Sequence, residues 1–163
     1  MKKVLVISAE LCTGCHACEM ACSLSHEGLC DLNLSRIGVM KTNGGGTNEN
    51  IPIVCQQCDR PICADVCVMG AIARDEETGG LIVKEELCVG CKTCVVACPL
   101  GGILYNHIRG CAMKCDLCGG DPECVKSCAY EALSYLPLDE WGRQQRLRGV
   151  RNLAKIYALI SEA

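Results

Sequence analysis

Cys88-Val89-Gly90-Cys91-Lys92-Thr93-Cys94-Val95-Val96-Ala97-Cys98-Pro99 is the stretch of this 163-residue chain that decides its fold. Two residues separate the first cysteine from the second and the second from the third, and three residues separate the third from the fourth. Three thiolates at this spacing wrap a loop around three corners of a [4Fe–4S] cube, with backbone N–H groups pointing at the sulfides. The fourth thiolate is carried away from that cube and reaches a second one. The stretch therefore predicts iron–sulfur clusters that come in pairs.

The same arrangement of cysteines occurs four times along the chain. The stretch above is motif three, motif one repeats its spacing, and motifs two and four lengthen only the loop inside the triple that wraps the cube. Because each iron takes one thiolate, the repeat predicts four [4Fe–4S] clusters. The predicted ligands are Cys12, Cys15, Cys18 and Cys22 in motif one, Cys55, Cys58, Cys63 and Cys67 in motif two, Cys88, Cys91, Cys94 and Cys98 in motif three, and Cys115, Cys118, Cys124 and Cys128 in motif four. Cys30 and Cys111 fall outside the motifs and have no assigned role.

Other uses of these cysteines fit the spacing poorly. A zinc site needs two C-x2-C pairs that close one tetrahedron, and a third cysteine three residues later has no place in it. A disulfide scaffold needs an oxidising compartment, and no export signal is visible. Residues 12–16 match the attachment pattern of a c-type haem, but a haem would leave Cys18 and Cys22 unexplained.

The composition leaves little material for an ordinary core. The chain has 18 Cys but no Phe, one Trp and four Tyr, so something else must occupy part of the interior. A net charge of −3 argues against nucleic-acid binding, which needs a basic surface. Residues 1–10 lack the apolar run of a secretion signal, and no stretch is apolar enough for a membrane span. We expect a soluble, cytoplasmic protein, although a partner with its own signal could export it.

Short β signals between the motifs predict an α+β fold that is loop-rich and organised around metal. A strand over 3–8 leads into motif one. Three hairpins are expected, from 36–41 with 51–54, from 71–74 with 81–84, and from 103–106 with 109–114. The first of them encloses a polar, glycine-rich loop over 42–50. Short helical turns are expected after the third cysteine of each motif.

The segment from Trp141 onward predicts an amphipathic C-terminal helix. Apolar residues recur there at helical spacing, at Leu147, Val150, Leu153, Ala154, Tyr157 and Ile160. Basic residues stand between them, at Arg143, Arg146, Arg148, Arg151 and Lys155. Two interpretations stay open: the helix packs on its own domain, or it docks on an acidic partner subunit.

The four motifs, in this order and with these spacers, resemble the four-cluster ferredoxin-like electron-transfer subunits of dimethyl sulfoxide reductase, nitrate reductase, formate dehydrogenase and hydrogenase. The resemblance covers about residues 1–135. Three segments are similar, more narrowly, to the small iron–sulfur subunits that accompany tungsten-containing aldehyde oxidoreductases. They are Cys12-Thr13-Gly14-Cys15-His16-Ala17-Cys18-Glu19, Cys22-Ser23-Leu24-Ser25-His26-Glu27-Gly28 and Lys114-Cys115-Asp116-Leu117-Cys118-Gly119-Gly120-Asp121-Pro122-Glu123-Cys124-Val125-Lys126.

The resemblance implies which cysteines share a cluster, because in that family the outer motifs exchange their last cysteines and so do the inner two. The implied sets are Cys12, Cys15, Cys18 and Cys128 for cluster 1, Cys55, Cys58, Cys63 and Cys98 for cluster 2, Cys67, Cys88, Cys91 and Cys94 for cluster 3, and Cys22, Cys115, Cys118 and Cys124 for cluster 4. It also implies an outer ferredoxin-like module over 1–50 and 100–135, an inner module over 51–99 inserted in it, and a C-terminal extension over 136–163. Sequential pairing, motif one with two and three with four, stays open.

The resemblance further implies an electron-transfer subunit with no catalytic residue of its own. Its expected partner is a large catalytic oxidoreductase subunit that holds tungsten or molybdenum, with a further electron-transfer subunit or a soluble ferredoxin as a second contact. The alternatives are a carrier for hydrogenase, formate or carbon monoxide dehydrogenase, and a free-standing polyferredoxin. A catalytic iron–sulfur enzyme would need a substrate domain for which too little chain remains.

The chain departs from the family pattern in its prolines. Only motif three has one after its last cysteine, while the other motifs have Ser23, Val68 and Ala129 there. Since proline shapes the turn without ligating iron, the departure affects loop geometry and not the number of clusters. Three cations near the motifs could raise the reduction potential of a neighbouring cluster, namely Arg60, Lys92 and Lys114.

Overall fold

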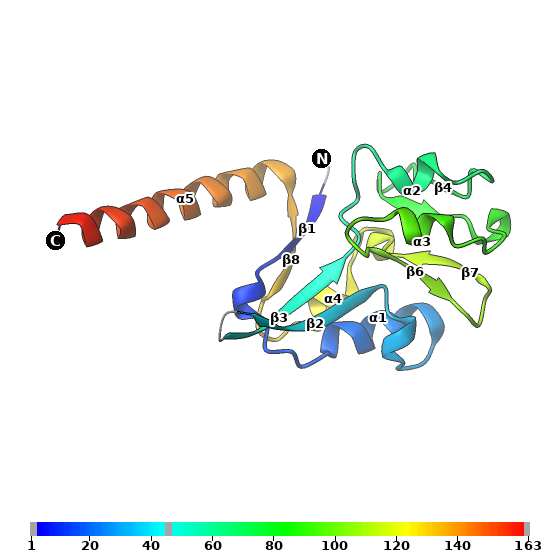
Figure 1. The fold of residues 1–163 in the computed structure, drawn as a ribbon, viewed down its shortest axis with the longest axis horizontal. Coiled ribbons are helices and arrows are strands. Elements are labelled where there is room, and N and C mark those ends of the chain that lie inside the picture. The colour runs from blue at the N-terminus through cyan, green and yellow to red at the C-terminus, as the bar shows by residue number, and fades with distance from the viewer. Residues whose placement is uncertain (1–2, 45–46, 162–163) are drawn as a thin grey trace.

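The computed structural model describes residues 3–44 and 47–161 as an α+β fold of short elements, as the sequence predicts (Figure 1). The helices are α1 (Ala17–Glu27), α2 (Ile62–Asp65), α3 (Thr93–Ala97), α4 (Glu123–Lys126) and α5 (Leu138–Ser161). The strands are β1 (Lys3–Ile7), β2 (Ile37–Gly44), β3 (Thr47–Val54), β4 (Ile72–Arg74), β5 (Leu81–Val83), β6 (Ile103–Asn106), β7 (Cys111–Lys114) and β8 (Leu133–Pro137). In the described chain every strand pairs with one other, so four small sheets replace a central sheet.

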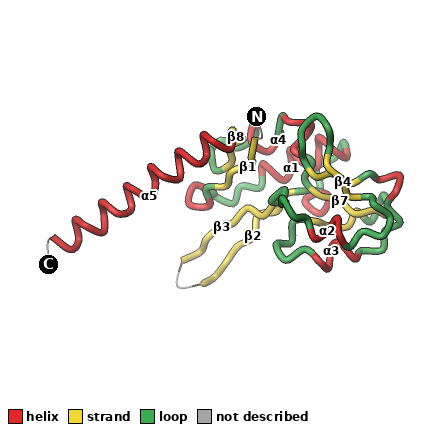
Figure 2. Tube along the Cα trace, turned by 90° about the horizontal axis from the view of Figure 1, so that it is seen from above, coloured by secondary structure: helices red, strands yellow, loops and turns green. Residues whose placement is uncertain are grey.

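The three expected hairpins are confirmed as the antiparallel pairs β2–β3, β4–β5 and β6–β7. The expected loop over 42–50 is wrong in extent, because β2 continues to Gly44 and β3 begins at Thr47. Thr42 faces Glu49 in this ribbon, which Figure 2 shows leaving the body of the molecule. Strands pair through backbone groups, and polar residues supply these as well as apolar ones. Residues 45–46 lie outside the described residues.

The antiparallel pairing of β1 with β8 joins the segment before motif one to the segment after motif four. No pattern in the sequence predicts β8. Ile7 faces Leu133, and Lys3 faces Pro137. Beyond the ladder, the Ser8 N–H donates to the carbonyl of Ala132 at 2.9 Å. Since β1 precedes motif one and β8 follows motif four, this pairing brings the first and last motifs together (Figure 1).

A helix carries the third cysteine of every motif. The expectation places a helical turn after that cysteine, whereas each helix begins one residue before it. The first residues of these helices are Ala17, Ile62, Thr93 and Glu123. The helix of motif one is also longer than a turn, with 11 residues. It ends where the N–H of Gly28, with φ 73°, donates to the Leu24 carbonyl at 3.0 Å, a left-handed cap that glycine adopts at little cost.

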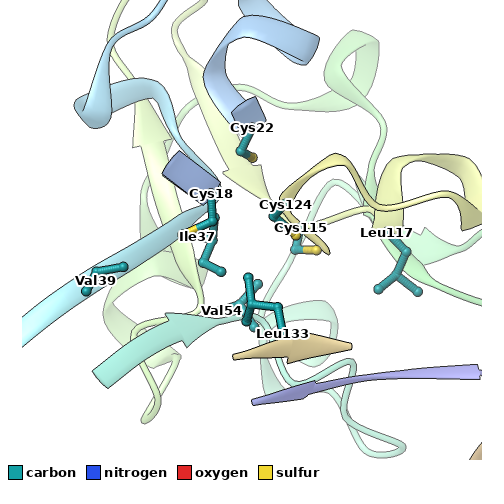
Figure 3. Close-up of a cluster of buried hydrophobic side chains, with 9 residues drawn as sticks. All are labelled: Cys18, Cys22, Ile37, Val39, Val54, Cys115, Leu117, Cys124 and Leu133. Carbon is teal, nitrogen blue, oxygen red and sulfur yellow. The ribbon is translucent and has the colours of Figure 1, made fainter. Parts of the chain in front are cut away.

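Two separate cores replace one continuous interior. The first, shown in Figure 3, contains Cys18, Cys22, Ile37, Val39, Val54, Cys115, Leu117, Cys124 and Leu133. The second contains Cys63, Ile72, Leu81, Cys94, Ile103 and Ala112. Each core thus mixes residues of two motifs with the sheets between them.

The cores divide the chain at other points than the expected module boundaries. Val54, at the end of β3, packs in the core of motifs one and four, although the sequence assigns 51–99 to the inner module. Ile103 and Ala112 of the β6–β7 hairpin pack in the core of motifs two and three, although the sequence assigns 100–135 to the outer module. The hairpins β2–β3 and β6–β7 therefore each contribute to a core on the other side of an expected boundary.

Helix α5 begins at Leu138, directly after β8, rather than at Trp141. Its first turns contact β1 and β8, and the rest runs away from the body (Figures 1 and 2). Of the expected apolar positions, Leu147, Val150 and Leu153 are exposed. The side chains of Arg148, Arg151, Ala154, Lys155, Tyr157 and Ile160 lie outside the described ones. Within the part of the chain that the structure describes, no helix is both long and apolar enough to cross a membrane.

Candidate iron–sulfur cluster sites

The first group of predicted ligands lines one cavity, which contains Cys12, Cys15, Cys18 and Cys128. Motif one supplies three of these thiols from the loop before α1 and from its first turn, and the segment after α4 supplies the fourth. Burial, together with the charges of Glu19, Cys12 and Cys128, raises the pKa of Cys18 to about 12. A thiol in such surroundings becomes a thiolate when a metal compensates its charge. The cavity therefore brings motif one and the last cysteine of the chain to a common site.

A second cavity contains Cys67, Cys88, Cys91 and Cys94. Cys67 follows α2, whereas the other three come from the loop before α3 and from α3 itself. Burial raises the pKa of Cys94, and the charges of Cys88 and Cys67 add to the effect. Cys91 is exposed, so this site reaches the protein surface.

In a third group of predicted ligands, the charges of two thiols act on the pKa of a third. Burial raises the pKa of Cys63, and the charges of Cys55 and Cys98 raise it further. These residues come from motif two and from the end of motif three. Cys58, the remaining predicted member of this set, is exposed on the loop between Cys55 and α2.

The fourth group lies inside the core shown in Figure 3, which labels Cys22, Cys115 and Cys124 close to one another. Burial raises the pKa of Cys124 strongly, and the largest charge contributions come from Cys115, Cys118 and Cys22. Cys22 lies on α1, and the others come from motif four. Cys22, Cys115 and Cys124 are buried and Cys118 is half-buried, so this group is the most enclosed of the four.

Backbone N–H groups donate to several of these sulfur atoms. The pairs are Arg36 to Cys22 at 3.3 Å, Gln57 to Cys55 at 3.4 Å, Ala71 to Cys67 at 3.3 Å and Ala112 to Cys88 at 3.4 Å. Such bonds favour the thiolate over the thiol and tune the potential of a cluster that the thiolate binds. Gathered thiols with N–H donors aimed at their sulfurs are the donor set that a [4Fe–4S] cluster requires. The residues present therefore fit this cofactor.

The residue before the second cysteine adopts a left-handed conformation in all four motifs. These residues are Gly14 with φ 72°, Gln57 with φ 51°, Gly90 with φ 68° and Leu117 with φ 63°. Glycine adopts this conformation freely, whereas Gln57 and Leu117 adopt it at a cost. No feature of the sequence indicates the latter two positions.

Replacing Gly90 with alanine is expected to weaken cluster 3. The added Cβ would collide with the carbonyl oxygen of Gly110, and the left-handed backbone adds about 1–2 kcal/mol. Gly70→Ala is the matched control, because Gly70 has φ 61° but no atom within 4 Å of its Cβ position. Iron release to a chelator should be faster for Gly90→Ala than for Gly70→Ala. Equal rates for the two variants would show that the contact with Gly110 is unimportant.

His26 and Asp116 form a half-buried polar link between motifs one and four that sequence reasoning missed. The His26 Nε2 lies 3.1 Å from an Asp116 carboxylate oxygen, and Arg36 pairs with the same carboxylate at 2.5 Å. Although burial opposes it, the bond from His26 and the charge of Arg36 hold the pKa of Asp116 well below its usual range. The bond to Asp116, with Cys118 and Cys22 nearby, raises the pKa of His26 to about 12. The sequence offered one sign of this link: His26 lies one helical turn after Cys22, so both side chains are on the same face of α1.

The three cations near the motifs differ sharply in their surroundings. Arg60 is exposed. Lys92 is also exposed and lies over the ring of Tyr105, 4.1 Å from its centroid. Lys114 on β7 is only 3% exposed. The sequence alone could not separate them.

Comparison with known proteins identifies the domain. Residues 47–136 match the 4Fe-4S dicluster domain, and residues 9–25 match a 4Fe-4S binding domain. The first match covers more than half of the chain and includes all of motifs two, three and four. The second covers motif one.

Curated relatives align with most of the chain. The chain is 40% identical over 124 residues to the polyferredoxin-like subunit of an aliphatic sulfonate oxidoreductase of Pyrococcus furiosus, covering 76% of this chain and 70% of the relative. It is 35% identical to the B subunit of anaerobic dimethyl sulfoxide reductase of Escherichia coli, and the alignment covers 82% of this chain and 73% of the relative. It is 38% identical to the electron transport protein HydN of Escherichia coli, and the alignment covers 82% of this chain and 87% of the relative. The chain therefore belongs to the family of iron–sulfur proteins with a 4Fe-4S dicluster domain, and its cofactors are [4Fe–4S] clusters.

Proposed function

We propose that the chain is an electron-transfer subunit that passes single electrons through four [4Fe–4S] clusters to or from a larger redox enzyme. The observation that carries the proposal is the gathering of the predicted ligands into four groups, each with thiols from two motifs. A bound [4Fe–4S] cluster accepts and releases one electron. The chain supplies the thiolates, the N–H donors and the burial that set its potential. No residue is assigned a catalytic role.

The ligand sets that we propose are those implied by the family resemblance. Cluster 1 takes Cys128 from the far end of the chain, and the cavity that holds Cys12, Cys15 and Cys18 supports this assignment. Sequential pairing would instead place Cys67 with these three residues. Cys67 lines the other cavity, which favours the exchanged pairing.

The groups lie in an order that suits a linear relay. Clusters 1 and 4 take ligands from the same helix, α1, through Cys18 and Cys22. Clusters 4 and 2 meet where Cys115 lies close to Cys55: burial raises the pKa of Cys115 to about 12, and the charge of Cys55 contributes. Clusters 2 and 3 share motifs two and three. The order is therefore cluster 1, 4, 2 and 3. Cys15 of cluster 1 and Cys91 of cluster 3 are exposed, as is Cys58 of cluster 2.

The partner is proposed to be a large catalytic subunit, and a tungsten-containing aldehyde oxidoreductase is favoured by the motif resemblance. The relatives named for sulfonate oxidation and dimethyl sulfoxide reduction support an oxidoreductase partner in general. A hydrogenase, formate dehydrogenase or carbon monoxide dehydrogenase is the alternative, as is a free-standing polyferredoxin. We propose that the protein is cytoplasmic. Anaerobic purification of the tagged chain from the cytoplasm of its native cells, followed by metal analysis of the accompanying protein, distinguishes these partners.

Protein purified without oxygen is expected to contain about sixteen iron atoms and sixteen acid-labile sulfides per chain, because each cube holds four of each. Colorimetric iron and sulfide assays against protein concentration measure this directly. Stoichiometric zinc with negligible sulfide would contradict the proposed function. About eight iron atoms would mean that only one of the two motif pairs holds clusters.

A further inference from the structure

The ammonium group of Lys114 is buried and, among the described residues, bonded only to backbone carbonyls. It donates to the carbonyl oxygen of Leu81 and, at 3.1 Å, to that of Cys115. Gln57 bonds to the backbone of the same two residues: its amide N–H donates to the Cys115 carbonyl at 2.7 Å, and its amide oxygen accepts from the Leu81 N–H at 2.6 Å. The amine is therefore held in one place, between β5 and the start of motif four.

No carboxylate among the described residues forms an ion pair with Lys114. Two acidic side chains line the same small cavity, Asp116 and Glu85. Asp116 is engaged by His26 and Arg36, and Glu85 is engaged by Arg109 at 3.1 Å. A buried charge without a counter-charge is strongly unfavourable. In the cluster-loaded protein something else must compensate the Lys114 charge.

Besides these two engaged carboxylates, predicted ligands of two clusters lie beside Lys114. Lys114 immediately precedes Cys115 of cluster 4. Leu81, whose carbonyl oxygen accepts from Lys114, packs in the same core as Cys63 of cluster 2. Lys114 thus lies at the junction where an electron passes between the core of motifs one and four and the core of motifs two and three.

Resting on the proposed function, we infer that Lys114 is the counter-charge of clusters 2 and 4 and sets the reduction potential at the junction between the two halves of the relay. Reduction adds one electron, and therefore one negative charge, to a cluster. A fixed cation in a poorly polarisable interior stabilises that reduced form. Lys114 is a positioning residue for charge and binds no iron.

The test compares Lys114→Gln, which keeps a hydrogen-bond donor and loses the charge, with Lys114→Arg, which keeps the charge. Arg60→Gln is the matched control, because it removes an exposed cation from the loop of cluster 2, where water and salt screen the charge. Each variant is first assayed for iron and sulfide. The potential of each cluster is then measured by anaerobic redox titration monitored by electron paramagnetic resonance.

Lys114→Gln is expected to lower the ratio of reduced to oxidised cluster 2 at a fixed potential by about tenfold or more, which corresponds to about 59 mV for one electron. Cluster 4 should shift in the same direction, whereas Lys114→Arg and Arg60→Gln should stay within about threefold of the parent, about 28 mV by the same relation. Unchanged potentials in Lys114→Gln with all clusters present would overturn the inference, and so would an equal shift in Arg60→Gln.

Two further outcomes are decisive. If Lys114→Gln loses clusters 2 and 4 while Lys114→Arg retains all four, the charge is required for assembly and the inference stands. If Lys114→Arg loses them as well, the shape of the side chain matters rather than its charge, and the inference fails. Absence of iron and sulfide in the parent protein would refute the proposed function instead, so the two failures are distinguishable.

Discussion

Replacing Cys128 with serine is expected to remove the cluster wrapped by Cys12, Cys15 and Cys18 at the opposite end of the chain. The cavity that holds all four thiols gives the reason, because a cube that loses one of its ligands is labile. The purified variant should contain about four fewer iron atoms than the parent. Iron and sulfide assays, with the resonance of the surviving clusters, measure the loss.

Double variants decide which cysteines share a cluster. Cys12→Ser with Cys128→Ser should lose no more iron than either single variant, because both residues serve cluster 1. Cys91→Ser with Cys128→Ser should lose twice as much, because they serve different clusters. The reverse pattern would establish sequential pairing and refute the proposed ligand sets.

The two cysteines outside the motifs provide matched controls for these serine variants. Cys30 is exposed and Cys111 is buried on β7. Both Cys30→Ser and Cys111→Ser should retain the full iron content, although Cys111→Ser also tests the effect of a buried hydroxyl. Loss of a whole cluster in either variant would show that a ligand has been misassigned.

Removal of all clusters under reducing, anaerobic conditions is expected to abolish the cooperative unfolding transition. Four of the nine buried residues in the core of Figure 3 are cysteines, namely Cys18, Cys22, Cys115 and Cys124. Metal binding supplies on the order of 10 kcal/mol of folding free energy in small metalloproteins. The remaining apolar side chains, without a single Phe, cannot replace that contribution.

Differential scanning calorimetry and near-ultraviolet circular dichroism of apo and cluster-loaded protein test this expectation. The apo protein should show no heat-absorption peak and no fixed aromatic signal. Reconstitution with iron and sulfide should restore both, which controls for damage during cluster removal. A transition in fully apo protein with the midpoint of the loaded form would contradict the expectation.

The features that the sequence predicted correctly are local ones. The hairpin β4–β5 follows from two short apolar runs around a turn-rich segment, and α5 follows from helical periodicity over many residues. The strand β8 escaped prediction because its partner β1 is at the other end of the chain, and five residues carry too little pattern to reveal such a pairing.

The ligand residues are predicted from spacing, but the residues around them could not be predicted in the same way. Gln57 and Leu117 adopt left-handed conformations that nothing in their residue type indicates. Lys114 and Arg60 are both cations beside a motif, and only the packing of β5 and β7 buries one of them. The ligand positions are local in the chain, whereas burial and charge environment arise from contacts between distant segments.

The pairing of β1 with β8 has a consequence for biosynthesis. A ribosome releases β1 and motif one before motifs two and three, but their strand partner and motif four only after them. Motifs two and three, by contrast, emerge together and complete their shared core once β6 and β7 have left the exit tunnel. Iron and sulfide can therefore reach motifs two and three as soon as these have emerged, while the thiols of motif one wait unprotected until motif four and β8 have been synthesised. The nascent chain is most vulnerable to oxygen during that interval.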